Sequence, residues 1–315
     1  MNDARKLVRL GDLVEIKHGF AFKGEHIQDD ETGDFLLTPG NFAIGGGFQW
    51  GKRKFYRGPV PDDYVLQPGD IIVTMTDLSK EADTLGYAAK VPASEKRLLH
   101  NQRLGKVIFK SKDLLPDYAH WLLRSQDYRN EILANYTGST VKHTSPSKIK
   151  EFRFYLPDPH QQQAVAATLG ALDDKIEVNR RMAATLEEMA RALYRSWFVD
   201  FDPVTARAQG RAPAHMDPAT AALFPARLTD AGLPEGWEIG TLGDIARNRR
   251  DQVQPSAIDP ETPYVGLEHM PRRSIAIGDW GVAGDVGSAK SRVGEGSLLF
   301  GKLRPYFHKV GLAPV

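Results

Sequence analysis

The first residues whose types and spacing could carry chemistry are Asp12, Glu15 and Lys17. They follow the order of a nuclease D…ExK site, in which carboxylates hold a divalent metal and a lysine assists the attacking water. Such a site takes its acidic residues from two strands, and the spacing from Asp12 to Glu15 is too short for that. We therefore expect a short helix around Asp12–Lys17 that presents these side chains to solvent.

Other catalytic signatures are missing from the sequence. There is no GxxxxGKS/T phosphate loop, no strict GxGxxG, no GxSxG serine elbow, and no Asn-Pro-Pro-aromatic string of an amino-methyltransferase. Gly45-Gly46-Gly47 lies in a polar turn without a following helix that would aim amide groups at a phosphate. The nine histidines are scattered and form no HExxH pair for a metal. The sequence therefore predicts no catalytic residue, no metal site and no cofactor bound by this chain.

Two short basic runs are the candidates for contact with nucleic acid. One is Lys52-Arg53-Lys54-Phe55-Tyr56-Arg57, and the other extends from Lys142 to Arg153. The whole chain has 41 basic and 40 acidic residues, for a net charge of +1, so any nucleic-acid binding must depend on local patches. Runs this short are also typical of solvated loops, and the sequence leaves both interpretations open.

Length and composition indicate a globular protein. The 315 residues, 41% of them hydrophobic, have room for two domains. The absence of cysteine excludes disulfides and thiolate metal sites and suits a reducing compartment. No window approaches 18 consecutive apolar residues, and the N-terminus has no apolar run. We expect a cytoplasmic protein without a signal peptide.

Residues 158–200 predict a single helix about 60 Å long. A helix of this length sets the spacing between the segments that precede and follow it. Asp158 is placed to cap it, Pro159 occupies its first position, and Pro203 prevents its continuation. Apolar residues recur in alternating steps of four and three, the spacing of a coiled-coil seam. The seam consists of Val165, Leu169, Leu172, Ile176, Asn179, Ala183, Leu186, Ala190, Leu193 and Trp197. An ordinary core helix with a broad apolar stripe is the alternative.

A seam of this kind requires a second helix, and no other segment of the sequence repeats its pattern. The partner helix is therefore expected from another chain or from sequence beyond this one. Asn179 is the polar member of the seam, where it either fixes the register of the pair or remains solvated.

Residues 1–157 predict a mixed α/β domain. The expected strands are Phe35–Leu37, Asp70–Met75, Gly86–Val91, Leu104–Phe109 and Phe152–Leu156. A helical pattern covers Asp117–Asn135. After the long helix, taken as 158–202, the proline-rich residues 203–236 predict a linker in which Ala219–Phe224 could form a short helix. A second domain is expected from Trp237, at 237–315.

The second domain repeats short strings of the first. Leu10-Gly11-Asp12 returns as Leu242-Gly243-Asp244, and Leu36-Leu37 returns as Tyr264-Val265, offsets of 232 and 228. Gly69 returns as Gly296, an offset of 227, and Gly86-Tyr87-Ala88 as Gly311-Leu312-Ala313, an offset of 225. The offset decreases slowly along the chain, which predicts two copies of one domain with short deletions in the second. The second copy lacks counterparts of Leu104–Leu156.

These features resemble the specificity subunit of type I restriction-modification systems. The residues that carry the resemblance are Tyr155-Leu156-Pro157, Gln162 to Leu172, Asp173, Lys175-Ile176, the string from Leu193 to Pro203, Gly232 to Trp237, Leu242-Gly243, Leu10-Gly11 and Gly19 to Lys23. Members of the family commonly have a Glu-Gln pair where this chain has Gln161-Gln162. They also have a complete second domain followed by a second long helix.

The resemblance implies α/β target recognition domains joined by a long coiled-coil helix, with the second domain incomplete here. Each domain would read half of a split double-stranded DNA target, and the helix would hold the halves at a fixed distance. The implied partners are modification (methyltransferase) subunits and a restriction/translocase subunit. S-adenosylmethionine, ATP and Mg²⁺ would be bound by those partners, and the unpaired helix would associate with a second copy or another specificity fragment.

Loop residues with flexible donors are the predicted DNA contacts: Lys23, Asn41, Lys52, Arg53, Lys54, Arg103, Ser139, Thr140, Lys142 and His143. Arg and Lys suit guanine, Asn suits adenine, and small hydroxyl groups suit phosphate. Two other functions stay open at this point. One is the recognition module of a fused restriction-methylation enzyme, and the other is a self-associating coiled-coil protein without a DNA role.

Overall fold

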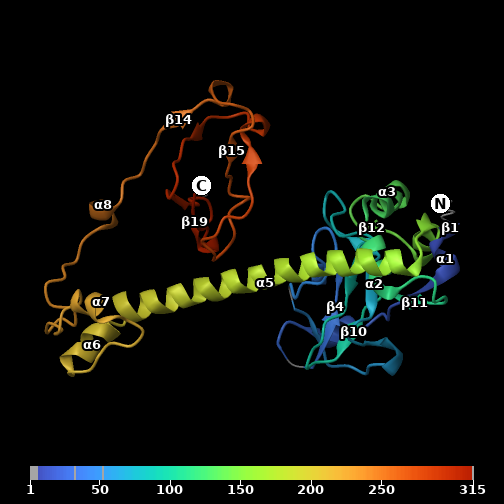
Figure 1. The fold of residues 1–315 in the computed structure, drawn as a ribbon, viewed down its shortest axis with the longest axis horizontal. Helices are drawn as coiled ribbons and strands as arrows, with labels where there is room; N and C mark the ends of the chain where they lie inside the picture. Colours follow the sequence, from blue (N-terminus) through green and yellow to red (C-terminus); the bar gives the residue numbers. More distant parts are fainter. Residues whose placement is uncertain (1–5, 32, 52, 314–315) are drawn as a thin grey trace. The chain divides into compact units, whose positions relative to one another are not determined.

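The computed structural model of the protein describes residues 6–31, 33–51 and 53–313. The chain divides into two compact units, Met1–Ile176 and Glu177–Val315. The division falls inside the long helix α5 (Pro159–Phe198) (Figure 1). The domain limits expected after residues 157, 202 and 236 stay predictions.

The first unit is built on two β-sheets. One has the strand order β3-β5-β4-β10-β6 and the other β2-β11-β7-β9, and of the described strand pairs the β4–β10 pair is the parallel one. Two further pairs join β1 to β13 and β8 to β12. The strands are β1 (Lys6–Arg9), β2 (Val14–His18), β3 (Ile27–Gln28), β4 (Asp34–Leu37), β5 (Phe55–Tyr56), β6 (Val65–Leu66), β7 (Ile71–Thr74), β8 (Thr76–Asp77), β9 (Ala88–Lys90), β10 (Leu98–His100), β11 (Leu104–Phe109), β12 (Lys142–His143) and β13 (Arg153–Leu156).

All five strands expected from the sequence are present; one helix prediction was wrong, and the other was confirmed except for a break. The expected helix at Asp12–Lys17 is α1 (Leu10–Leu13) followed directly by β2. Val14 and Ile16 are buried while Glu15 and Lys17 alternate with them, which is the period of a strand. The second helix, Asp117–Asn135, is interrupted. It forms α2 (Pro116–Leu122) and α3 (Gln126–Asn135), because Ser125 caps α3 by accepting a hydrogen bond from the Tyr128 N–H.

The core of this unit lies on both sides of the four-stranded sheet. Leu10, Val14, Tyr128, Ile149 and Phe152 belong to one buried cluster, to which α2, α3 and α4 (Pro146–Lys150) contribute. A second buried cluster joins the two sheets and contains Phe35, Leu37, Phe42, Ile72 and Leu104 among others. A third buried cluster consists of Phe22, Leu36, Tyr56 and Leu99. Three hydrophobic clusters therefore hold the loops of this unit in place.

Helix α5 begins as the sequence predicts. The Gln161 N–H donates to the Asp158 carboxylate at 2.9 Å, and Pro159 is the first helical residue. The seam is uncovered over most of its length, since Leu172, Ile176 and Leu186 are 57%, 47% and 58% exposed. A long helix on a mixed α/β domain is thus confirmed. Among the described residues, no helix is both long and apolar enough to span a bilayer.

The described residues of the second unit form the remainder of α5, three short α-helices and three two-stranded pairs. The helices are α6 (Asp202–Ala208), α7 (Pro218–Ala222) and α8 (Leu242–Ile245). Phe201 has a left-handed backbone (φ 55°), so the chain turns before α6 begins at Asp202, and Pro203 is the second residue of this helix. The strands are β14 (Gln252–Val253), β15 (Pro263–Tyr264), β16 (Gly281–Val282), β17 (Lys290–Ser291), β18 (Leu298–Phe300) and β19 (Val310–Leu312), paired as β14–β17, β15–β16 and β18–β19.

Hydrogen bonds of the first unit recur in the second at the residue offsets of the sequence repeat. The Thr38 N–H donates to the Asn41 side chain, and the Gly266 N–H donates to the His269 ring, each at 2.9 Å and each offset by 228. The Gln67 N–H donates to the side chain of Asp70, and the Gly294 N–H to that of Ser297, offset by 227. The helices α1 and α8 also correspond, at an offset of 232. These recurrences support the internal repeat.

The alignment expected at Gly86 and Gly311 was wrong by three residues. In the first unit Ile72 pairs with Ala89, and in the second Leu299 pairs with Gly311. Gly311 therefore corresponds to Ala89, at an offset of 222 rather than 225. The offset is 227 at the first strand of each pair and 222 at the second strand, because the connection between the two strands is five residues shorter in the second unit.

Candidate functional site

The nuclease-like residues near the N-terminus are all engaged in contacts within the first unit. Asp12 pairs with Arg9 at 2.9 Å, Glu15 pairs with Lys150 at 2.6 Å, and the Lys17 ammonium donates to the Asp63 carbonyl oxygen at 2.9 Å. The hydrogen bond from Lys150 holds the pKa of Glu15 below its usual value. Within the described part of the chain, no three His, Asp or Glu side chains gather as metal ligands would. Asp12, Glu15 and Lys17 are thus engaged in separate contacts within the domain rather than gathered at one site.

A row of loop segments is joined side by side by backbone hydrogen bonds. The Gln102 N–H donates to the Phe20 carbonyl at 2.9 Å, the Met75 N–H to the Arg103 carbonyl at 2.9 Å, and the Thr144 N–H to the Met75 carbonyl at 3.0 Å. We call this row, made of residues 20–23, 101–103, 75–77 and 142–144, the loop edge. It brings together segments that are more than 100 residues apart in sequence.

Three predicted DNA-contacting residues are exposed on the loop edge: Lys23, Arg103 and His143. Ser139 and Thr140 are exposed in the adjoining turn, which reciprocal backbone hydrogen bonds between Thr137 and His143 close. Among the described contacts, neither Arg103 nor His143 has an ion-pair partner. The loop edge therefore offers donors that are not already committed within the protein.

Two predicted residues point into the protein instead. Lys142 is 6% exposed and its ammonium donates to the Ser79 carbonyl at 2.6 Å. Asn41 is fully buried; it accepts from the Thr38 N–H and donates to the Trp50 carbonyl at 2.9 Å. Because a buried donor that loses its partner is costly, neither side chain is free to contact DNA.

The basic run at 52–57 lies against acidic side chains. Arg53 pairs with Glu31 at 2.9 Å, and Lys54 pairs with Asp29 at 2.6 Å. Lys52 lies outside the described residues. The pairing partners lie more than 20 residues upstream, so the local run alone does not reveal that these charges are neutralised.

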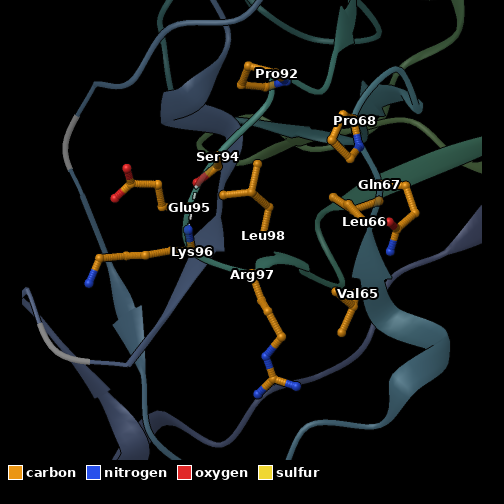
Figure 2. A pocket seen from close by; sticks show the side chains of 10 residues that line it. All are labelled: Val65, Leu66, Gln67, Pro68, Pro92, Ser94, Glu95, Lys96, Arg97 and Leu98. Carbon is orange, nitrogen blue, oxygen red and sulfur yellow. Dashed lines mark hydrogen bonds between the residues drawn. The ribbon is translucent and has the colours of Figure 1, made fainter.

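A small cavity lies at the edge of the five-stranded sheet, lined by Val65–Pro68, Pro92 and Ser94–Leu98 (Figure 2). Its volume is about 190 Å³, whereas ligand pockets usually measure roughly 300–1,000 Å³. The Arg97 guanidinium is held by a two-point contact with Asp34 at 2.9 and 2.5 Å. Size and lining both argue against a small-molecule site here, and the loop edge remains the better candidate.

Helix α5 is attached to the first unit at two points. Near its start, the fully buried Gln162 accepts from the Leu115 N–H at 2.8 Å and donates to the carbonyls of Asp113 and Pro157. Three turns further on, Asp173 lies 3.5 Å from Arg124. The two contacts fix the direction in which the helix leaves this unit.

Arg124 was not expected from the sequence. Its guanidinium donates to the Gly45 carbonyl at 3.1 Å and lies 4.5 Å from the centre of the Trp121 ring. Its side chain also fills the space beside Gly46, where a Cβ would meet it at 2.7 Å. Gly46 thus leaves room for the Arg124 side chain, a role that no local sequence signal shows.

The family model described as the type I restriction modification DNA specificity domain matches residues 2–188. The chain belongs to this family. The match includes the loop edge, both attachment points of α5 and most of the seam.

Similar curated proteins are type I restriction enzyme specificity subunits. The MjaIX subunit of Methanocaldococcus jannaschii is 26% identical over 190 residues, covering 59% of this chain and 40% of that protein. The HindI subunit of Haemophilus influenzae is 27% identical over 263 residues, covering 62% of this chain and 57% of that protein. The chain spans about half the length of these relatives. A type I specificity subunit structure from M. genitalium aligns with a TM-score of 0.42 and 18% identity, covering 71% of this chain and 50% of that one.

Proposed function

We propose that the protein is the DNA-specificity subunit of a type I restriction-modification complex. Its first domain reads one half of a split double-stranded target through the loop edge. The supporting observation is the family match over residues 2–188, which contains every segment of the loop edge. Lys23, Arg103 and His143 supply exposed donors there, and Arg is the side chain that most often reads guanine in the major groove.

The long helix acts in this proposal as a spacer and a docking surface. Its exposed seam, from Val165 to Trp197, pairs with a second long helix in another copy of this chain or in another specificity fragment. Modification (methyltransferase) subunits and a restriction/translocase subunit bind the assembled specificity subunit. These roles support a cytoplasmic location.

Catalysis belongs to the partners in this proposal, and the chain itself is not an enzyme. S-adenosylmethionine, ATP and Mg²⁺ are bound by the modification and restriction subunits, and the assembled complex methylates adenine and cleaves DNA. The engagement of Asp12, Glu15 and Lys17 in structural contacts supports this division of labour. It also weakens the alternative of a fused restriction-methylation enzyme within these residues.

The decisive experiment is DNA binding by the full chain assembled with its modification subunit. The complex is first used to select its target from a library of randomised duplexes. It is then titrated with the selected duplex and with random duplexes at moderate salt. We expect the selected duplex to bind at least about 1,000-fold more tightly. Equal binding of both duplexes would contradict the specificity role, because charge contacts alone do not distinguish sequences.

A further inference from the structure

A second loop stands beside the loop edge and is organised around one buried carboxylate. Asp77 is 5% exposed and accepts hydrogen bonds from the Ser79 N–H at 2.5 Å and from the Thr84 N–H and hydroxyl at 2.6 Å each. Burial raises the pKa of Asp77, but these hydrogen bonds outweigh it and hold the pKa below its usual value. The carboxylate therefore stays ionised and closes residues 77–85, which we call the Asp77 loop.

Two buried cations complete the Asp77 loop. Arg129, 7% exposed, donates to the carbonyls of Leu85 at 2.7 Å and Ala82 at 2.5 Å. Lys142 donates to the Ser79 carbonyl at 2.6 Å. Ala82 is buried with a left-handed backbone, φ 57°, a conformation that costs a non-glycine residue free energy. Charges committed to backbone carbonyls in this way make the loop rigid.

The rigid loop presents an apolar side chain to solvent. Leu78 is 68% exposed. The side chain of Lys80 is 96% exposed, and its ammonium lies 3.8 Å from the exposed Glu81 carboxylate, a partner that a phosphate would replace. A leucine held in place and left in water gains free energy when a partner covers it, and the rigid backbone loses little conformational entropy in the process.

Strand pairing places the tip of this loop next to predicted DNA contacts. β8 and β12 run antiparallel, with Asp77 opposite Lys142. Leu78 therefore leaves the pair at the same end at which the turn 138–141 arrives. That turn carries the exposed hydroxyl groups of Ser139 and Thr140.

We propose that the Asp77 loop and the turn 138–141 together enter a groove of duplex DNA, where Leu78 makes an apolar contact with a base, such as a thymine methyl group. Lys80 contacts a backbone phosphate. This proposal rests on the DNA-specificity role above and adds the residues that read the target. Hydroxyl and cationic donors around one apolar tip match a groove, where base edges and phosphates alternate with methyl groups.

The experiment compares Leu78→Ser with Ile44→Ser in the full chain assembled with its modification subunit. Ile44 is a suitable control because it is 78% exposed on a different loop of the same domain. Each complex selects targets from a library of randomised duplexes. We expect Leu78→Ser to lose base preference at one or two adjacent positions and to bind the wild-type target about tenfold more weakly. Ile44→Ser and the conservative Leu78→Met should keep the full preference.

Other results would overturn the inference in distinguishable ways. If Leu78→Ser selected the wild-type target with wild-type affinity, Leu78 would not read DNA. If Leu78→Ser lost the modification subunit but kept its DNA preference, the loop would be a protein-docking site. If the wild-type complex selected no target at all, the DNA-specificity role itself would fail first.

Replacing Lys80 with Gln should lower the slope of log affinity against log salt by about one.

Discussion

The side-chain carbonyl of Gln162 accepts a 2.8 Å hydrogen bond from the backbone N–H of Leu115, and no part of Gln162 is exposed to solvent. The same side chain donates to the carbonyl oxygens of Asp113 and Pro157 at 2.7 and 2.9 Å. One glutamine thus joins the first turn of α5 to the loop before α2. A spacer helix can transmit a fixed distance only if its base is held in this way.

Replacing Gln162 with Leu should destabilise the first domain by about 3 kcal/mol, because it leaves a buried N–H and buried carbonyl groups without partners. Chemical unfolding followed by tryptophan fluorescence measures the effect. Gln161→Leu is the matched control, since Gln161 is exposed one residue earlier in the same turn. Equal stability of the two variants would show that the Gln162 contacts contribute nothing.

Gly19 packs against Asn101, the first residue of the loop-edge segment 101–103, so it should not tolerate a side chain. A Cβ at this position would lie 2.0 Å from the Asn101 carbonyl oxygen, a backbone atom that cannot move by itself. We expect Gly19→Ala to cost about 2 kcal/mol of stability and to weaken DNA binding by displacing Arg103. Gly24→Ala is the control, because nothing lies within 4 Å of its Cβ position. The idea fails if both variants have the same melting temperature.

Local periodicity was enough to predict α5 and five of the thirteen strands β1–β13 of the first domain. The 3.5-residue repeat and the Asp158 cap are encoded within a few turns of the helix itself. The helix expected at Asp12–Lys17 failed for the opposite reason. Its strand conformation is set by pairing with β11, about 90 residues away, and short segments follow such tertiary contacts rather than their own propensity.

The site was less predictable because the orientation of a side chain depends on distant partners. Lys142 and His143 are neighbours in sequence, yet the β8–β12 pair turns one inward onto Ser79 and leaves the other exposed. No sequence feature marks Leu78 as a contact residue, because its exposed position depends on hydrogen bonds that the Asp77 carboxylate and the Arg129 guanidinium make with the loop. Residue type alone identified possible donors but not which of them face solvent.

Buried histidines should make the stability of the first domain depend on pH. Burial, with a smaller contribution from the positive charge of Arg124, lowers the pKa of His120 to about 4, and burial lowers the pKa of His100 to about 4. In the unfolded chain both pKa values return to about 6.5. The unfolded state therefore binds more protons between these values, so stability is complete above pH 6.5 and falls as the pH drops toward 4.

Each histidine should contribute a loss of about 2 kcal/mol between pH 7 and pH 5. Urea unfolding of the wild type and of His120→Gln at these two pH values tests this. The variant should lose less stability than the wild type over the same interval, whatever its stability at pH 7. An identical decrease in both proteins would mean that His120 titrates normally.

Leu186 tests the seam of α5, where it is 58% exposed. Leu186→Asp places a charge on a surface that must be desolvated when a second helix packs against it. We expect this variant to weaken assembly with a second copy or with partner subunits at least about 100-fold, which corresponds to about 3 kcal/mol. The fold of residues 1–157 should be unchanged, because that domain has its own buried clusters, and Leu186 belongs to none of them. Ala184→Asp is the control, since two residues along a helix place the same charge roughly on the opposite face.

Sedimentation equilibrium of both variants, with and without the modification subunit, measures assembly. If the two variants assembled equally well, the seam would not be the surface through which α5 finds its partner.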